Sequence, residues 1–257
     1  MIKVLIWGIG GRMGKNILEG LSSFDNVQAV GGVDKFADPS QFPVPVFKSG
    51  KDVNVNADVI IDFSRPDALD EILEYALARK TGIMLATTGY SAEQQKAIDK
   101  ASESIAVFQS SNMSLGVNLL IELCRKASKF LGENYDVEII EQHHNQKVDS
   151  PSGTALSIAD AINEEVDNSK EFVYGRHDKN CRRDKKEIGI HAVRGGTIVG
   201  KHDVLFIGKD EVITISHEAQ SRAVFAQGAI RAGIFLSSKK NGKYSMKDLL
   251  RSAGQEK

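Results

Sequence analysis

A mainly apolar run that leads directly into a glycine-rich loop opens the chain, and it constrains the fold more than any other segment. Residues 2–7 have the hydrophobic character of a strand buried on both faces of a parallel sheet. Residues 8–14 read Gly-Ile-Gly-Gly-Arg-Met-Gly, and a helical pattern covers residues 12–22. Glycines here permit a tight turn and let the backbone approach a pyrophosphate at the helix start. The segment therefore predicts a strand, loop and helix that bind a dinucleotide.

A second predicted strand ends at an acidic residue that suits the same ligand. Residues 27–33 form the strand, and Asp34 follows it, twenty residues after Gly14. A carboxylate at about this distance usually accepts hydrogen bonds from the adenosine ribose. Lys35 comes next and offers the opposite charge, so these residues favour use of both NADH and NADPH, with NADH modestly preferred. The alternative interpretation is a glycine-rich turn without a cofactor, because Met13 interrupts the common spacing.

Strands and helices alternate along the first part of the chain. Further strands are expected at residues 59–62, 83–86 and 105–109, and further helices at residues 67–79 and 92–102. This alternation implies an α/β fold with a doubly wound parallel sheet, in which ligands bind beyond the carboxyl ends of the strands. Small and hydroxyl residues recur in the turns at those ends, at residues 63–66, 87–90 and 110–113. Together these turns are expected to form one rim of the dinucleotide site.

From residue 136 the pattern changes to that of a second domain of the α+β kind. A strand at residues 136–142 is followed by a helix at 154–165 and by strands at 188–194, 203–207 and 212–218. A short link joins the last two strands, which suits antiparallel pairing. The charged loop at residues 176–187 is predicted to be a solvated connector. A helical pattern returns after Arg222.

A histidine-rich segment carries most of the chemistry in this sequence. His143, His144 and Lys147 precede a Ser-Gly-Thr turn at residues 152–154 that opens a helix. Imidazole gives and takes protons near neutral pH, and a nearby lysine supplies a positive charge or a proton. Backbone N–H groups at a helix start bind carboxylate or phosphate. The segment predicts a proton-transfer site beside an anion-binding site; the alternative is an ordinary helix cap next to surface histidines.

Composition narrows the classes of partner. The formal net charge is −1 over 257 residues, so neither nucleic acid nor an anionic membrane is expected as a partner. We expect no membrane span and no secretory leader. Cys124 and Cys181 lie far apart and have neither a metal-ligand spacing nor a disulfide pattern, so we expect no metal and a cytoplasmic protein.

These motifs together resemble the dihydrodipicolinate reductase (4-hydroxy-tetrahydrodipicolinate reductase) family over nearly the whole chain. The resemblance rests on the glycine loop, on residues 62–66 (Asp-Phe-Ser-Arg-Pro), on residues 112–118 and above all on the histidine-rich segment. It implies a Rossmann-like dinucleotide-binding domain at residues 1–113 and 223–257. It also implies a second α+β domain at residues 114–222, built on a mixed or antiparallel sheet, that binds substrate and oligomerises. The expected protein is a homotetramer that uses NADH or NADPH to reduce a cyclic dicarboxylate to tetrahydrodipicolinate in lysine biosynthesis through diaminopimelate.

The resemblance further implies roles for individual residues. His143 matches the proposed acid/base and Lys147 the proton donor, and the substrate contacts match His144, Gly153 and Thr154. The pyrophosphate would lie against Gly8, Ile9, Gly10, Gly11, Arg12 and Met13, and the ribose beside Asp34 and Lys35. The nicotinamide end would be lined by Ala86, Thr87, Thr88, Ser110, Ser111, Asn112 and Met113. The family often has glycine at the position of Ala86.

Other functions remain compatible with this organisation. Another dehydrogenase of small keto or imino acids would share the nucleotide-binding half but would carry a different motif in the second domain. A regulator that senses the dinucleotide would bind it without turnover and would not need a proton donor such as Lys147. A metal hydrolase built on His143 and His144 is disfavoured, because adjacent strand residues face opposite ways and no third ligand follows at useful spacing.

Overall fold

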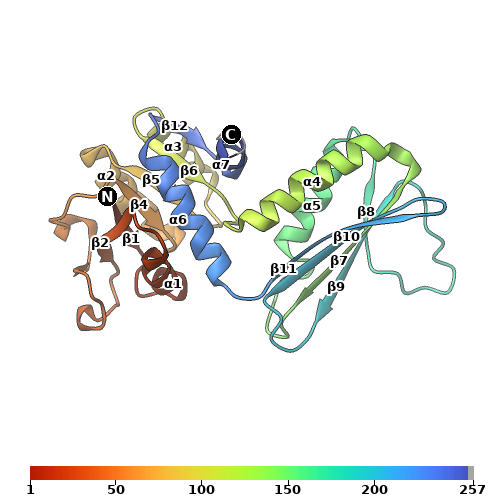
Figure 1. Ribbon diagram of the computed structural model, residues 1–257, viewed down its shortest axis with the longest axis horizontal. Coiled ribbons are helices and arrows are strands. Elements are labelled where there is room, and N and C mark those ends of the chain that lie inside the picture. Colours follow the sequence, from red (N-terminus) through yellow and green to blue (C-terminus); the bar gives the residue numbers. More distant parts are fainter. Residues whose placement is uncertain (254–257) are drawn as a thin grey trace. The chain divides into compact units, whose positions relative to one another are not determined.

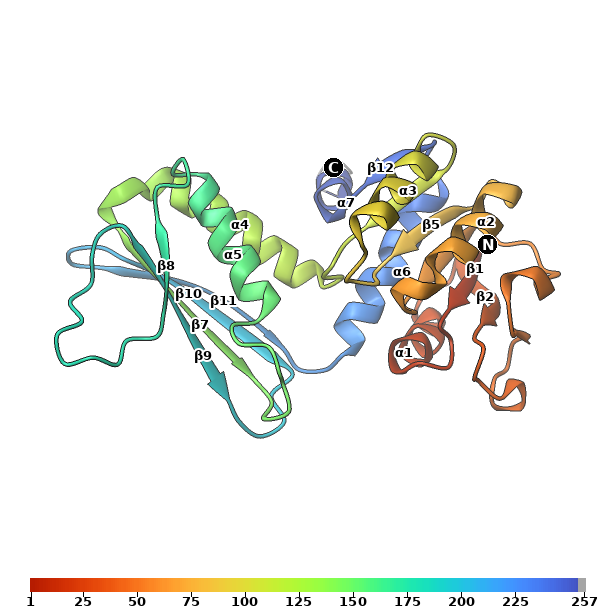
Figure 2. The same ribbon diagram turned by 180° about the vertical axis from the view of Figure 1, so that it is seen from behind.

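The chain forms two compact units in the computed structural model, which describes residues 1–253 (Figures 1 and 2). The first unit comprises Met1–Leu115 and Arg222–Lys257, and the second comprises Gly116–Ser221. The polypeptide therefore leaves the first unit once, forms the whole of the second, and returns to complete the first.

A parallel sheet, seven-stranded within the described residues, forms the centre of the first unit in the order β12-β6-β5-β4-β1-β2-β3. Its strands are β1 (Ile2–Trp7), β2 (Val27–Val33), β3 (Val46–Phe47), β4 (Val59–Asp62), β5 (Gly82–Leu85), β6 (Ala106–Gln109) and β12 (Gly242–Tyr244). The part from β3 to β6 has the strand order of a Rossmann fold. Ligands of such sheets bind where the order reverses, here between β1 and β4. The predicted doubly wound parallel sheet is confirmed.

Helices cover both faces of this sheet (Figure 1). They are α1 (Arg12–Gly20), α2 (Leu69–Arg79), α3 (Ala92–Ser102), α6 (Ala223–Ser237) and α7 (Met246–Ala253), with short 3₁₀ helices at Leu21–Ser23, Pro39–Gln41, Gly50–Asp52 and Pro66–Ala68. Val4 and Ile6 of β1 pack with α1, α6 and α7, whereas Leu5 and Trp7 pack with α2 and α3. Because successive strand residues face opposite sides of a sheet, burial of both faces explains the largely hydrophobic sequence of β1.

The second unit, all of which the structure describes, is built on a five-stranded mixed sheet of order β11-β10-β7-β9-β8. Its strands are β7 (Asp136–His143), β8 (Glu171–Tyr174), β9 (Glu187–Arg194), β10 (Gly200–Ile207) and β11 (Val212–Ala219). The pairs β7–β9 and β8–β9 are parallel, whereas β10 is antiparallel to both β7 and β11. The predicted mixed sheet and its antiparallel last pair are confirmed.

Two helices pack on one face of the second sheet (Figure 2). They are α4 (Leu115–Leu131), which ends in a 3₁₀ turn at Gly132–Asn134, and α5 (Gly153–Glu164). Val137 and Ile139 of β7 join the core beneath them. Buried and half-buried residues alternate along β7, so Glu141 and His143 lie on the same helix-covered side. The core face of the sheet therefore changes from apolar to polar at the carboxyl end of β7.

The structure departs from the expected elements at short or irregular segments. The sequence pattern did not predict β3, β8, β12 or α7. The strands β3 and β12 have only two and three residues, which is too few to show a period. The helices expected at residues 12–22 and 67–79 are shorter, since 3₁₀ turns replace the end of one and the start of the other. The strand expected at residues 83–86 runs one residue earlier.

The prediction that residues 176–187 form a solvated connector is wrong at two arginines. Arg176 pairs with Glu138 and Glu187 at 2.9 and 2.6 Å. Arg183 pairs with Glu138 and Asp136 at 2.9 and 2.7 Å. Glu138 points away from the core face of β7, so the half-buried carboxylate takes these cations as its partners.

Candidate functional site

The glycine loop between β1 and α1 has the geometry that a dinucleotide requires. Gly8 has φ +81°, in the left-handed region, and its N–H donates to the Val33 carbonyl at 2.8 Å. A Cβ at Gly14 would lie 2.3 Å from the Gly8 carbonyl oxygen, so helix and loop can approach each other only with glycine there. Among the described residues, no side chain caps the start of α1 at Gly11. The N–H groups of this helix start therefore suit an anionic ligand.

Asp34, at the end of β2, lies directly against this loop. Its carboxylate accepts hydrogen bonds from the N–H groups of Gly10, Phe36 and Ala37 at 2.9–3.0 Å. The structure thus brings Asp34 to the glycine loop, as the sequence spacing predicts. Lys35 follows on the exposed surface, with its Nζ 5.9 Å from the centre of the Phe36 ring.

The other predicted dinucleotide contacts lie at the ends of β5 and β6. Ala86 follows β5 and Ser110 follows β6, and the Ser110 N–H donates to the Leu85 carbonyl at 3.2 Å. A cavity of about 130 Å³ is lined by Phe63, Ala86, Ser111, Asn112, Met113 and Phe225. Phe225 lies more than 100 residues after Met113 in the sequence, so its place in this cavity could not be predicted from neighbouring residues. Thr87 and Thr88 occupy the loop after β5.

Asp62, at the end of β4, forms hydrogen bonds that hold neighbouring residues of the same rim in place. The carboxylate is fully buried and accepts hydrogen bonds from the Ser64 hydroxyl, from Thr87 Oγ1 at 2.8 Å and from the Tyr90 hydroxyl at 3.4 Å. Burial raises the pKa of Asp62, and the hydrogen bonds from Ser64 and Thr87 act against that shift. Asp62 therefore fixes Thr87, one of the predicted contacts, although the sequence assigned Asp62 no role.

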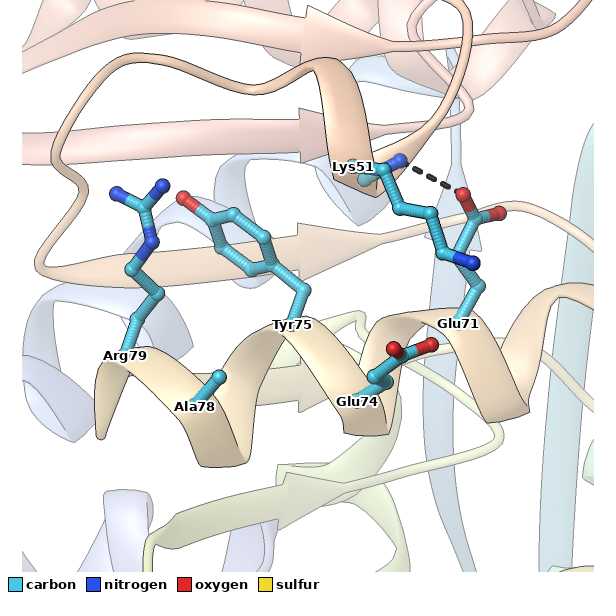
Figure 3. Close-up of a pocket in the computed structure, with 7 residues that line it drawn as sticks. Lys51, Glu71, Glu74, Tyr75, Ala78 and Arg79 are labelled. Carbon is cyan, nitrogen blue, oxygen red and sulfur yellow. Dashed lines mark hydrogen bonds between the residues drawn. The ribbon is translucent and has the colours of Figure 1, made fainter.

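Another cavity in the first unit, of about 200 Å³, lies along α2 (Figure 3). Several of its polar groups bind within the fold: Glu71 accepts from the Gly50 N–H at 2.7 Å, and Arg79 donates to the Val53 carbonyl at 3.1 Å. The Tyr75 hydroxyl donates to the Val55 carbonyl at 3.3 Å. These contacts attach a loop to α2, and none of the predicted site residues lines this cavity.

In the second unit, His143 ends β7 and takes part in a buried polar network. It is 8% exposed, and its Nδ1 lies 2.6 Å from Glu141 Oε2. Two guanidinium nitrogens of Arg194 each lie 2.7 Å from one Glu141 oxygen. The Ser152 N–H donates to Glu141 at 2.9 Å. Burial lowers the pKa of His143, whereas Glu141 acts to raise it.

A second buried histidine lies against the first. The rings of His143 and His202 are edge to face, with centres 5.3 Å apart. His202 Nε2 is 3.1 Å from Ser152 Oγ, and burial lowers the pKa of His202 to about 4. His202 is therefore neutral at neutral pH.

The predicted proton donor and anion-binding turn lie beside each other after β7. The Lys147 N–H donates to the carbonyl of His144 at 3.2 Å, which closes a tight turn. Gly153 and Thr154 are the first residues of α5, and the Ser152 side chain caps that helix by accepting from the Ala155 N–H at 3.1 Å. Lys147 Nζ is 2.8 Å from an oxygen of Asp149. The Lys147 ammonium lowers the pKa of Asp149, and the Gly153 N–H contributes in the same direction.

Two family models match the chain almost end to end. The model described as "Dihydrodipicolinate reductase, N-terminus" matches residues 2–113, and that described as "Dihydrodipicolinate reductase, C-terminus" matches residues 116–250. The chain belongs to the dihydrodipicolinate reductase family.

Named relatives of this reductase family match over nearly their whole length. The 4-hydroxy-tetrahydrodipicolinate reductase of Caldanaerobacter subterraneus subsp. tengcongensis is 50% identical over 98% of this chain and 99% of its own. That of Clostridium novyi is 47% identical over 98% and 99%. Among solved structures, dipicolinate-bound dihydrodipicolinate reductase from Paenisporosarcina sp. TG-14 has a TM-score of 0.78 and 25% identity, over 95% of this chain and 97% of that one.

Sequence reasoning did not assign a site role to three residues that lie around His143. Glu141, Arg194 and His202 were not predicted as site residues, although each contacts the network around His143. One signal was available: Glu141 precedes His143 by two residues in a strand, so both face the same side.

Within residues 1–253, no group of three His, Cys, Asp or Glu side chains could hold a metal ion. In the same residues, no helix is both long and apolar enough to cross a membrane.

Proposed function

We propose that this chain reduces 4-hydroxy-tetrahydrodipicolinate to tetrahydrodipicolinate with a nicotinamide cofactor, in diaminopimelate and lysine biosynthesis. One observation carries the proposal. A single chain combines the Asp34-bound glycine loop with the His143–Lys147 segment at the start of α5, over the full length that the named reductases share.

We assign dinucleotide binding to the first unit. The close contact of Gly8 and Gly14, the uncapped start of α1 in the described chain and the cavity beside Phe225 all fit such a ligand. The start of α1 would hold the pyrophosphate, and the rim at Ala86 and Ser111 would hold the nicotinamide end. When bound, the nicotinamide supplies the hydride.

We assign substrate binding to the second unit. The start of α5 at Gly153 and Thr154, with His144, would hold a carboxylate, because N–H groups at a helix start favour anions. Hydride transfer to the substrate ring leaves negative charge toward its ring nitrogen, and His143 and Lys147 would stabilise that charge. Lys147 would then donate the proton, with His143 as the acid/base. General acid help of this kind accelerates reactions by about 10²–10⁴-fold.

Both NADH and NADPH are expected to serve, with NADH modestly preferred. Asp34 Oδ1 already accepts two backbone N–H groups, whereas Oδ2 accepts only one and has capacity for a ribose hydroxyl. The same carboxylate would repel the 2′-phosphate of NADPH, and Lys35 would attract it. At 4 Å in water each interaction is worth about 1 kcal/mol, so the two nearly cancel.

A homotetramer is the assembly that we infer for this chain. On the face of the second sheet opposite α4 and α5, Ile140 and Leu205 are half-buried, and Val193 and Val212 are exposed at 45% and 55%. Exposed apolar side chains on a sheet face are compatible with a contact between protein chains.

We also infer a cytoplasmic location. Cys124 and Cys181 form no disulfide, and cysteines without a disulfide are usual in the reducing cytoplasm.

A coupled assay tests the function directly. The purified protein is supplied with pyruvate, aspartate semialdehyde, the preceding synthase and a reduced dinucleotide, whose oxidation is followed by absorbance. Oxidation that depends on the synthase supports the proposal. Tight dinucleotide binding without oxidation would favour a sensing regulator, and oxidation with simple keto acids alone would favour another dehydrogenase.

A further inference from the structure

We propose that Glu141 is the positioning residue of this site: its buried carboxylate fixes which nitrogen of His143 carries the working proton and stabilises the imidazolium. This inference rests on the proposed role of His143 as acid/base. Glu141 is fully buried, so it is proposed to act through His143 and not by contact with substrate.

The placement of Glu141 follows from the strand. Glu141 and His143 are two residues apart in β7, so both side chains lie on the core side, and the Glu141 side chain is fully buried. Its Oε2 is 2.6 Å from His143 Nδ1. A buried carboxylate is costly unless it is paired and hydrogen-bonded, so partners must compensate for its charge.

Arg194 and Ser152 supply that compensation. Arg194 donates to both Glu141 oxygens at 2.7 Å, in the bidentate geometry that favours an ionised carboxylate. Arg194 also donates to the Asp149 carbonyl at 2.8 Å, which holds the guanidinium in place. Burial alone would raise the pKa of Glu141, but the hydrogen bonds from Arg194, His143 and Ser152 lower it. Glu141 is therefore ionised at neutral pH.

An ionised Glu141 determines the tautomer of His143. A carboxylate can only accept hydrogen bonds, so the Nδ1 of His143 must carry a hydrogen. The other nitrogen, Nε2, is then the atom that gives or takes the reacting proton. A Cβ at Gly200 would lie 3.0 Å from this Nε2. Glycine at that position leaves room beside the reactive nitrogen.

Among the charged groups around His143, Glu141 is the one that favours the imidazolium, because the others act against it. Burial lowers the pKa of His143, and Lys147 and Arg194 lower it further. His202 of β10 is neutral, and it faces His217 of β11. Glu141 acts in the opposite direction through its hydrogen bond and its charge. A carboxylate behind an imidazole has this orienting and charge-stabilising role in hydrolytic triads as well.

Glu141→Gln tests the proposal, because it removes the charge and keeps the size. We expect kcat to fall about 10–100-fold, by analogy with the carboxylates that orient metal-binding histidines, with dinucleotide affinity unchanged. The pKa of His143, followed by NMR of its ring nitrogens without substrate, should fall, and the alkaline limb of the kcat profile should move to lower pH. Glu138→Gln is the matched control, since Glu138 lies in the same strand but pairs with Arg176 and Arg183 on the opposite side.

The outcomes separate this inference from the proposed function. Unchanged tautomer and pKa of His143 in Glu141→Gln would overturn the positioning role even in a fully active reductase. Full activity of His143→Ala would instead overturn the acid/base role on which the inference rests. If Glu141→Gln does not fold, Glu141→Asp decides: it keeps the charge but shortens the reach, so an altered His143 tautomer supports the proposal and an unaltered one refutes it.

Discussion

Lys147 and Asp149 form an ion pair at the start of α5, with Nζ and Oδ1 2.8 Å apart. The Asp149 carboxylate also receives the Gly153 N–H. A carboxylate of the chain itself therefore sits at the lysine and the helix start that we assign to the substrate. The position can hold a carboxylate, and in our proposal the substrate competes with Asp149 for it.

Asp149→Asn should consequently tighten the binding of planar dicarboxylates. Asp149 is more than half exposed, and exposed ion pairs contribute about 0–1 kcal/mol. We expect the Kd for dipicolinate, measured by calorimetry, to fall by up to about fivefold. Asp160→Asn, on the exposed side of α5, should leave it unchanged. Weaker binding by Asp149→Asn would mean that Asp149 orients Lys147 rather than occupying the anion position.

Lys147→Ala should lose turnover by orders of magnitude, because it removes both the proton donor and a fixed positive charge. Dinucleotide affinity, measured by fluorescence titration, should stay near the wild-type value, since Lys147 belongs to the second unit. Lys209→Ala, an exposed lysine of the same unit, serves as control. A rise in KM with kcat unchanged would make Lys147 a carboxylate clamp instead.

Stability should fall in mild acid because of His202. Its pKa is about 4 in the folded protein, against an ordinary value of 6.5, so between these pH values the unfolded chain binds more protons. The stabilisation is complete above pH 6.5 and is lost as the pH falls to about 4, by about 3 kcal/mol in all. Urea unfolding of His202→Gln should depend less on pH in this range, whereas the exposed His177→Gln should match wild type. Equal slopes for His202→Gln and wild type would refute the prediction.

Lys35→Ala should raise KM for NADPH and leave KM for NADH almost unchanged, because only NADPH offers a 2′-phosphate to the lysine. Added salt should weaken NADPH binding more than NADH binding in the native protein, and this difference should disappear in the variant. Steady-state kinetics with both cofactors provide the measurement, and Lys51→Ala, also exposed, is the control. A hundredfold native preference for NADPH would argue against the ribose position that we give Asp34.

The sequence was sufficient for the fold because local patterns and topology agreed. The hydrophobic run of β1 and the alternation of strands and helices both predict the same parallel sheet. The elements that escaped prediction are the shortest ones, such as β3 and β12, whose pairing depends on neighbours that are distant in sequence. The arginines of residues 176–187 were misjudged for the same reason, since Glu138 lies 38 residues before Arg176.

The candidate site shows the same difference between residues that are close in sequence and residues that strand pairing brings together. His143, Lys147 and Gly153 fall within eleven residues, so one motif contains them all. The groups that hold them, Arg194 and His202, come from β9 and β10, and only the pairing of those strands with β7 brings them to the histidine. A motif can indicate which side chains react, but the strand register determines which residues contact and position them.

The interrupted first unit has a consequence for synthesis on the ribosome. One face of the nucleotide-binding sheet is covered by α6 and α7, and Phe225 lines the cavity beside Met113. The residues of α6 and α7, including Phe225, are translated after the entire second unit, whereas Met113 is translated before it. A nascent chain that ends before residue 222 therefore leaves the apolar face of β1 and β4 without α6 and α7, and the cavity beside Met113 lacks Phe225. The second unit is therefore complete first, and the residues of α6 and α7 complete the core of the first unit only afterwards.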